Sequence, residues 1–295
     1  MGERVFKTLD EQVSILRSRK LEILDEEVEL VKDFLLLNNY YRISGYSLTL
    51  RNHDVFYEGT TFRNIMDIYT FDCHLRNILM AHLETVEVSV KSVFAYEFSK
   101  RYGGNGYLDS DNFTDPQEYL RIIGKADVQK TKNLSDEAYI QHYVNDLQTE
   151  MPLWVYVDLL TFSDISSMYC IAKPDLQKAI AEFYGLRTSN GVDILKEYLR
   201  TLSILRNFCA HGRRLFNRLF VRKPSLSGKE KKLLRRDENG VVDNAHLYGF
   251  VIELRRLLSS EDFLRLKTDI VSLTEKYPFV SMKYYGFRET WKDDL

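Results

Sequence analysis

The sequence predicts an all-α protein, and three observations carry that prediction. Glycine (14) and proline (5) are sparse among the 295 residues, which disfavours the turn-rich strands of a β-sandwich or barrel. Between about residues 62 and 101 the chain contains neither of them. Apolar side chains recur in that stretch every three or four residues, as they do on the buried face of a helix. A single helix of this length extends ~60 Å.

Shorter helices are expected on the N-terminal side of the long one. Residues 9–19 have a helical period, and Asp25 can cap a second helix that ends near Asn38 and Asn39. Residues 47–50 are β-prone and lead into a loop. Thr60 or Thr61 is then the expected cap of the long helix.

A glycine-rich run at residues 103–106 is expected to end the long helix. Residues 107–133 lack a clear period, which predicts a long, partly ordered connection. Ser163 or Asp164 is the expected cap of a later apolar segment. Helices are also expected at residues 135–147, 153–160, 174–183, about 192–209, 246–258 and 260–277.

The cysteines and the N-terminus bear on the cellular compartment. Cys73, Cys170 and Cys209 are too few for a disulfide framework and have no metal-binding spacing, so reduced thiols are expected. The N-terminus lacks the apolar stretch of a signal peptide, and no apolar run approaches the ~20 residues that span a bilayer. The sequence therefore predicts a soluble, cytoplasmic protein with no membrane partner.

Charge is distributed unevenly along the chain. The net charge of the whole chain is only −2, yet residues 200–236 hold twelve positive residues and one negative residue, Glu230. Clustered arginine and lysine side chains neutralise phosphates and release their counterions, which points to a polyanion site. A solvated basic face without a ligand stays open as the alternative.

Within the basic segment, Arg206 and His211 lie five residues apart near the end of a predicted helix, and Gly212 follows as a candidate C-terminal cap. Five residues of regular helix separate two side chains by about 140°, so convergence requires the helix to end or a second copy to approach. Histidine suits proton transfer near neutral pH, and arginine stabilises a charged phosphate. A capping role for His211 remains the alternative on spacing alone.

Four blocks of sequence resemble the Abi_2 family, the AbiD/AbiF-like abortive-infection proteins of bacteria. The blocks span residues 40–46, residues 59–77, residues 152–160 and residues 205–218. Together the match runs from about residue 8 to residue 224. Where many relatives have a second histidine after the motif, this chain has Gly212.

The resemblance implies membership of the HEPN superfamily, whose ribonucleases carry an Arg-His motif on a helical bundle and commonly act as dimers. It implies that Arg206 and His211 are that motif and that Asn207 is its polar neighbour. Flanking phosphates would contact Arg213, Arg214, Asn217 and Arg218. The expected organisation is an N-terminal helical region (1–58), a HEPN-like helical domain (59–224) and a C-terminal helical extension (225–295).

The prediction that follows is a metal-independent endoribonuclease that cleaves RNA in anti-phage defence, as an abortive-infection protein or toxin. It needs no cofactor and no metal, forms a homodimer and is restrained by a protein or RNA antitoxin. The alternative is a non-catalytic HEPN protein that binds RNA or a protein partner.

Two further features of the sequence are candidates for RNA cleavage or RNA binding. Arg76 and His82 form a second Arg-His pair, but six residues of helix turn their side chains apart, so no catalysis is expected there. The tyrosine-rich block at residues 40–46 suits stacking of single-stranded RNA bases. A packed turn is the alternative reading of that block.

Overall fold

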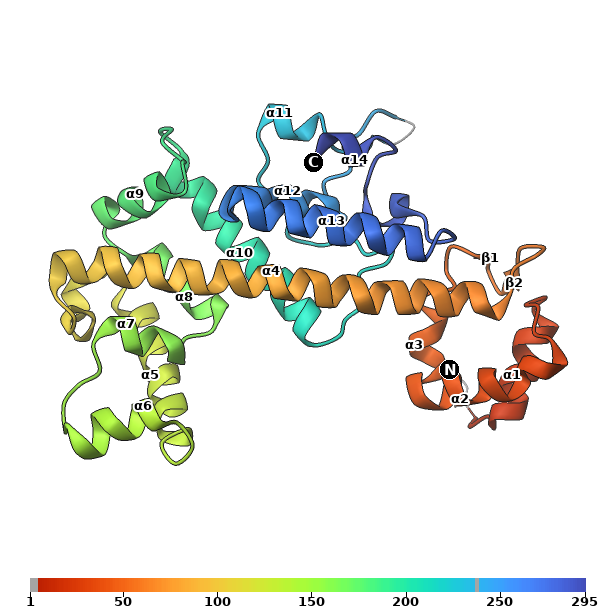
Figure 1. Ribbon diagram of the computed structural model, residues 1–295, viewed down its shortest axis with the longest axis horizontal. Helices are drawn as coiled ribbons and strands as arrows, with labels where there is room; N and C mark the ends of the chain where they lie inside the picture. The colour runs from red at the N-terminus through yellow and green to blue at the C-terminus, as the bar shows by residue number, and fades with distance from the viewer. Residues whose placement is uncertain (1–4, 237–238) are drawn as a thin grey trace.

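The computed structural model describes residues 5–236 and 239–295 of the chain. Helices dominate these residues, and the β structure is limited to a two-stranded antiparallel hairpin and isolated bridges. Figure 1 shows an elongated molecule organised along one long helix, α4 (Phe62–Tyr102). The predicted all-α class is confirmed. None of the described helices is long and apolar enough to cross a membrane.

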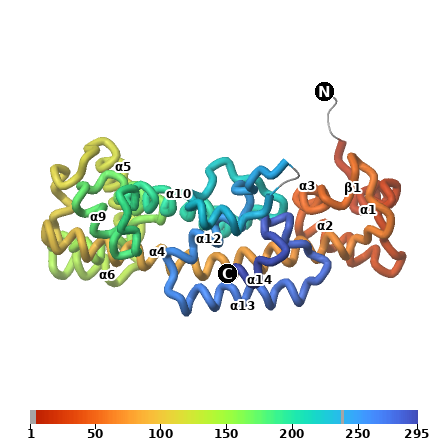
Figure 2. The backbone as a smooth tube through the Cα atoms, turned by 90° about the horizontal axis from the view of Figure 1, so that it is seen from above, coloured from red at the N-terminus to blue at the C-terminus, as the bar shows by residue number. Residues whose placement is uncertain are grey.

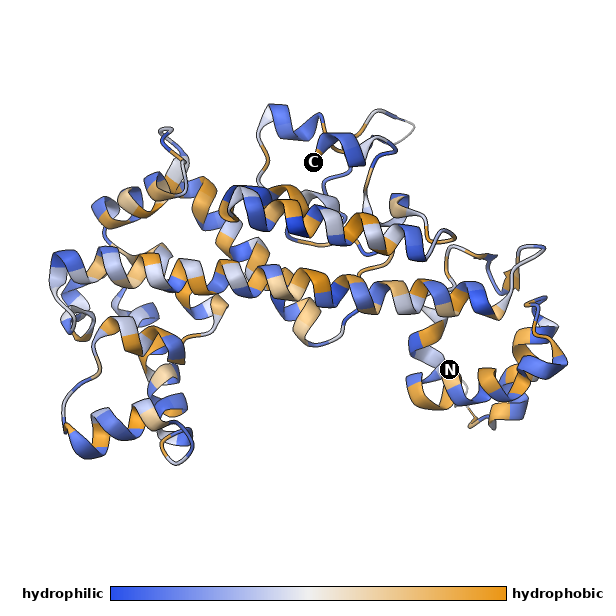
Figure 3. Ribbon diagram, viewed as in Figure 1, coloured by the Kyte–Doolittle hydropathy of each residue, from blue (hydrophilic) through white to orange (hydrophobic). Residues whose placement is uncertain are grey.

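Helix α4 begins and ends where the sequence predicts. Thr61 is its N-cap, and a capping box pairs the Thr61 side chain with the Asn64 amide while Asn64 reaches back to Thr61. Gly103, with φ of +77°, ends the helix. Figure 3 shows hydrophobic and hydrophilic residues along the whole length of α4. The buried positions change along the helix because different elements cover it in turn.

The N-terminal region covers the first turns of α4 (Figure 1). It comprises α1 (Leu9–Ser18), a 3-10 turn (Asp25–Glu27), α2 (Val28–Asn38), α3 (Tyr40–Ser44), β1 (Arg51–Asn52) and β2 (Val55–Phe56). Two expectations need correction. Asp25 starts the 3-10 turn and does not cap α2, and the strand expected at residues 47–50 lies at Arg51–Asn52, where it pairs with Val55–Phe56.

The segment expected to be a partly ordered connection is largely a helix, which corrects the prediction for residues 107–133. After 3-10 turns at Gly106–Leu108 and Ser110–Asn112, α5 spans Pro116–Lys132. The Asp115 side chain accepts from the amides of the first turn, and Pro116 occupies the first helical position. Helix α5 contains few apolar residues, so its helical period is weak in the sequence, although Asp115 provides a clear capping signal.

Most of the central helices pack against the other half of α4. They are α6 (Ala138–Gln141) with a π turn (His142–Asp146), α7 (Leu153–Tyr156) with a 3-10 turn (Val157–Leu159), α8 (Phe162–Ile171), α9 (Pro174–Phe183) and α10 (Gly191–Ala210). Thr161 caps α8 in a capping box with Asp164, so the prediction of Ser163 or Asp164 as the cap was wrong. Helix α10 packs against α4, α8 and α9.

The C-terminal residues pack onto the same core (Figure 2). They form α11 (Gly228–Lys231), α12 (Tyr248–Leu257), α13 (Ser260–Lys276), a 3-10 turn (Met282–Tyr285) and α14 (Trp291–Asp294). Helix α13 lies along α4, and α12 packs against α10. Residues C-terminal to the family resemblance therefore contribute directly to the core around the long helix.

A buried carboxyl group, Glu253 on α12, lies at the contact with α10. Its Oε2 is 2.6 Å from the Thr201 hydroxyl, and its Oε1 accepts from the Ser225 amide at 3.0 Å. Thr201 also lies 2.8 Å from the carbonyl oxygen of Glu197. Since the hydroxyl has one proton, a protonated Glu253 can donate to Thr201 while Thr201 donates to Glu197. Burial raises the pKa of Glu253 to about 8.

This shift predicts a pH dependence of stability. The folded state holds the Glu253 proton more tightly than the unfolded state, whose pKa is near 4.5. The contribution of Glu253 is therefore complete below pH 4.5 and is lost as the pH rises toward 8, by up to about 1.4 kcal/mol per pH unit. Urea unfolding of Glu253→Gln should show a flatter dependence between pH 5 and 8. Glu261→Gln, at an exposed position, should keep the wild-type slope.

Candidate active site at the end of helix α10

Helix α10 ends in a Schellman motif that sets the course of the chain after His211. The amide of Gly212 donates to the carbonyl oxygen of Cys209, and the amide of Arg213 donates to that of Phe208. Gly212 has φ of +60°, a conformation that glycine adopts without steric cost. The predicted helix end is confirmed. The segment from His211 to Arg218, the post-α10 loop, begins here.

The three residues predicted as catalytic occupy different surroundings. His211 is the exposed C-cap of α10, and its amide donates to the Asn207 carbonyl oxygen at 3.1 Å. Arg206 lies one and a half turns earlier, and its Nε donates to Oε2 of Glu87 on α4 at 3.2 Å. Among the described residues, no hydrogen bond or ion pair joins the Arg206 and His211 side chains. The end of the helix leaves both groups accessible, with 30% of the Arg206 side chain exposed.

Glu87 orients Arg206, a role that the sequence analysis missed. The Glu87 side chain is buried, and its second oxygen, Oε1, lies 3.1 Å from Nζ of Lys91. Because Glu87 engages Nε of Arg206, the two terminal nitrogens of the guanidinium group have no partner among the described residues. An arginine held in this way presents its two terminal NH₂ groups in a fixed plane. The signal in the sequence was a carboxylate that lies four residues after Leu83 and three before Val90, on the apolar face of α4.

The post-α10 loop gathers three arginines predicted to contact phosphate. The guanidinium carbons of Arg213 and Arg218 lie 5.0 Å and 4.8 Å from the ring centroid of Phe208. Arg214 donates to the Phe216 carbonyl oxygen at 2.8 Å. Burial, together with the charges of Arg214 and Arg213, lowers the pKa of Arg218. The three positive charges therefore lie close enough to repel one another.

Several other arginines of the basic segment form ion pairs with carboxylates, and the arginines of the post-α10 loop do not. Ion pairs engage Arg200 and Arg222 with Glu197, Arg206 with Glu87, and Arg235 with Asp243. Within the described parts of the chain, no carboxylate lies within 4 Å of the charged groups of Arg213, Arg214 or Arg218. Asn217 belongs to the same loop, with φ of +49°, and its backbone amide donates to the Tyr284 carbonyl oxygen. A bound anion would relieve the repulsion among these three arginines.

A buried carboxylate, Asp72 on α4, anchors the post-α10 loop. Its oxygens accept from the backbone amides of Leu215 at 3.1 Å and Phe216 at 2.9 Å. The hydroxyls of Tyr46 and Tyr285 donate to it at 2.8 Å and 3.0 Å, and Arg76 forms an ion pair with it. Burial raises the pKa of Asp72, and the charge of Arg76 acts in the opposite direction. We call these groups the Asp72 cluster.

The Asp72 cluster unites residues that are distant in the sequence. Tyr46, Asp72 and Leu215 belong to three of the four blocks that resemble the Abi_2 family, and Tyr285 comes from the C-terminal residues. The resemblance of these blocks did not by itself predict a role for Asp72. An aspartate among the apolar residues of the long helix was the available signal, since a buried carboxylate requires donors.

The second Arg-His pair has two separate environments. Arg76 belongs to the Asp72 cluster, and its Nη1 also lies 3.4 Å from the Arg213 carbonyl oxygen. His82 is buried against α13, where its Nε2 is 4.0 Å from Oδ2 of Asp269. Burial lowers the pKa of His82. Neither side chain has the exposed position of His211.

The fold and the site define a class of protein. It is an all-α protein built on one long helix, with an exposed histidine at a helix end beside arginines that have no carboxylate partner in the described part of the chain. Among its described residues, no group of three or more His, Cys, Asp or Glu side chains is placed to hold a metal ion.

The family follows from a direct comparison. The family model described as Abi-like protein matches residues 33–217, more than half of the chain, and the chain belongs to this family. That membership associates the protein with abortive infection, as the sequence blocks predicted. No curated protein and no solved structure matches the chain.

Proposed function

We propose that this protein is an endoribonuclease of the HEPN type that acts in abortive infection without a metal ion. The observation that carries the proposal is the exposed His211 at the start of a loop whose arginines have no carboxylate partner among residues 5–236 and 239–295. RNA supplies the phosphates that such a loop binds, and histidine supplies the proton transfer that cleavage needs.

The roles of the site residues follow from their positions. His211 acts as general acid or base, and Arg206, oriented by Glu87, directs two N–H donors at the phosphate undergoing reaction. Asn207 positions the motif or the substrate. Flanking phosphates are bound by Arg213, Arg214, Asn217 and Arg218.

The reaction uses the nucleophile that RNA carries. The 2′-hydroxyl oxygen loses its proton to a base and attacks the adjacent phosphorus. The bond from phosphorus to the 5′ oxygen breaks, and that oxygen takes a proton from an acid. The products are a 2′,3′-cyclic phosphate and a free 5′-hydroxyl group, so the step needs no external reductant, oxidant or water.

This chemistry predicts cleavage that is independent of divalent metal. Purified protein incubated with total RNA in excess EDTA should cleave it and leave 2′,3′-cyclic phosphate or 3′-phosphate ends. End-group analysis by ligation and mass spectrometry provides the measurement. Activity that disappears in EDTA and returns with Mg²⁺ would contradict the proposed chemistry.

The need for both an acid and a base predicts a homodimer. One chain offers one exposed Arg-His motif, and a two-fold axis near His211 brings in the second from an identical chain. Light scattering should give about twice the 34.8 kDa mass of the chain. A cysteine introduced at exposed Ala210 should cross-link the two chains, whereas one at exposed Glu261 should not. A fully active monomer would refute this arrangement.

The alternative is a non-catalytic member that binds RNA or a protein partner. The ion pair between Arg206 and Glu87 favours it, because the arginine is already neutralised in the free chain. The ribonuclease and an RNA-binding member both predict RNA binding that weakens with salt. They differ in covalent products, so RNA that is bound but never cut by the dimer would favour the binding protein.

A further inference from the structure

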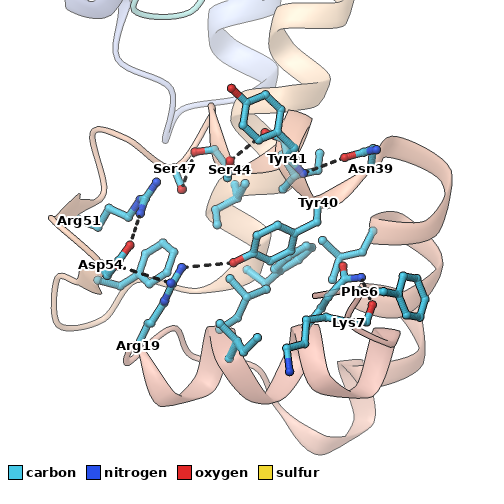
Figure 4. Close-up of a pocket in the computed structure, with 18 of the residues that line it drawn as sticks. Phe6, Lys7, Arg19, Asn39, Tyr40, Tyr41, Ser44, Ser47, Arg51 and Asp54 are labelled. Carbon is cyan, nitrogen blue, oxygen red and sulfur yellow. Dashed lines mark hydrogen bonds and ion pairs between the residues drawn. The ribbon is translucent and has the colours of Figure 1, made fainter. Parts of the chain in front are cut away.

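A large pocket opens among the N-terminal helices, at the first turns of α4 (Figure 4). Its volume is about 760 Å³, within the range of small-molecule sites. The walls come from α1, α2, α3, the β1–β2 hairpin and α4. The functions proposed above do not use this pocket, although the tyrosine-rich block at residues 40–46 forms one side of it.

The interior of the pocket is apolar. Leu35, Ile43, Phe56, Phe62 and Ile65 are buried residues that line it. The Tyr40 ring crosses the middle of the pocket, with its hydroxyl group turned toward Arg19 (Figure 4). Such a lining favours a ligand with an aromatic or otherwise apolar body.

One end of the pocket carries an excess of positive charge. Arg19 and Arg51 share a single carboxylate, Asp54, at 3.4 Å and 3.1 Å. The Asp54 side chain is 67% exposed, whereas that of Arg51 is 15% exposed. Solvent screens the attraction between an exposed carboxylate and its partners. Two arginines with one such carboxylate leave one positive charge at the pocket uncompensated.

Buried polar atoms at the pocket also lack partners. Within the described residues, Nε of Arg51 and Oε1 of Gln12 are buried without a hydrogen bond. Both residues line the pocket. Unsatisfied buried polar atoms are rare in folded proteins, and the Arg51 guanidinium group therefore has donor capacity that the chain itself leaves unused.

We propose that this pocket binds a small amphipathic anion, a molecule with an aromatic body and one carboxylate, sulfonate or phosphate group, and that its occupancy acts on the post-α10 loop through α3. The anionic group pairs with Arg19 and Arg51, and the aromatic body packs against Tyr40 and the apolar floor. One negative charge balances the excess that Asp54 leaves.

Helix α3 connects the pocket to the proposed active site. Tyr40 and Ile43 face the pocket, while Nη2 of Arg42 donates to the Gly212 carbonyl oxygen at 2.5 Å. Gly45, just after α3, lies against Arg214, since a Cβ atom there would be 3.4 Å from its Nε. A ligand that shifts α3 therefore acts on the first half of the post-α10 loop.

Binding can be tested with 1-anilinonaphthalene-8-sulfonate, which has an aromatic body and one anionic group. Fluorescence titration of the full chain should show one saturable site. Arg19→Gln and Arg51→Gln should each weaken binding at least tenfold. Ile15→Phe, which narrows the pocket, should also weaken it, whereas Arg63→Gln, which replaces an exposed arginine on α4 paired with Glu27, should leave it unchanged.

The neutral analogue N-phenyl-1-naphthylamine separates charge recognition from apolar adsorption. Its affinity should be the same for wild type, Arg19→Gln and Arg51→Gln, and it should fall in Ile15→Phe. Thermal unfolding of each variant establishes that it is folded at the temperature of the titration, and Arg19→Lys, which keeps the charge, should retain most of the sulfonate affinity. Equal sulfonate binding by wild type and both glutamine variants would overturn the proposed site, as would no binding by wild type.

The proposed coupling through α3 rests on the proposed function only because that function makes the post-α10 loop the active site. The coupling is therefore tested without RNA cleavage. Saturation with the sulfonate should change amide hydrogen exchange at Gly212–Phe216 at least threefold in wild type. Arg42→Ala should bind the probe with unchanged affinity and lose the effect on the loop. Binding without any change in exchange at these amides would overturn the coupling and leave both the site and the ribonuclease proposal standing.

Discussion

Replacing His211 with alanine should reduce RNA cleavage at least about a hundredfold, because a positioned acid or base contributes roughly 10²–10⁴-fold to such reactions. Its side chain is exposed and has no hydrogen bond among the described residues, so the free energy of unfolding should change by less than about 0.5 kcal/mol. Initial rates on a defined RNA and urea unfolding together provide the measurement. Arg206→Ala should cause a comparable loss of cleavage.

Two matched controls accompany these variants. Arg222→Ala removes another ion-paired arginine of the basic segment and should leave the cleavage rate within about twofold of wild type. His82→Ala removes the histidine of the other Arg-His pair and should also leave activity nearly unchanged. If His82→Ala proved as damaging as His211→Ala in a folded protein, the assignment of the motif to Arg206 and His211 would be wrong.

Asp72→Ala should produce the largest loss of stability, about 3–5 kcal/mol. The substitution leaves Arg76 buried without its counter-ion and removes the acceptor for the amides of Leu215 and Phe216. Urea unfolding should show this as a lower transition midpoint with an unchanged slope. Asp175→Ala removes an exposed aspartate paired with Arg101 and should change stability by less than about 0.5 kcal/mol.

The conservative variant Asp72→Asn separates the stability of the fold from the position of the loop. The asparagine keeps one oxygen acceptor, but its side-chain NH₂ group faces other donors. The backbone amides of Leu215 and Phe216 therefore lose part of their anchor. Cleavage should fall even under conditions in which the variant is fully folded. A folded Asp72→Asn protein with wild-type cleavage would show that the cluster supports the fold without positioning the loop.

The sequence alone determined the elements whose ends carry strong local signals. Thr61, one of the two expected caps, and Gly103 bound the long helix, and α9 begins at Pro174 as its expected range predicted. Gly212 likewise marks the end of α10. These features depend on interactions within a few residues, so they are visible in one stretch of chain. The same locality explains the missed helix α5, whose cap at Asp115 was clear but whose apolar stripe is weak.

Only the tertiary structure shows which arginines of the basic segment pair with a carboxylate and which do not. The sequence shows twelve cations in residues 200–236 but not that Glu87 engages Arg206 or that Arg213 and Arg214 lack a carboxylate. Those differences arise because α4 and α10 cross, which brings together side chains more than a hundred residues apart. Asp72 is the clearest case, since its backbone partners lie at residues 215 and 216. Local chemistry sets where helices begin and end, whereas burial of charge depends on which helices meet, and that is fixed only when the chain is folded.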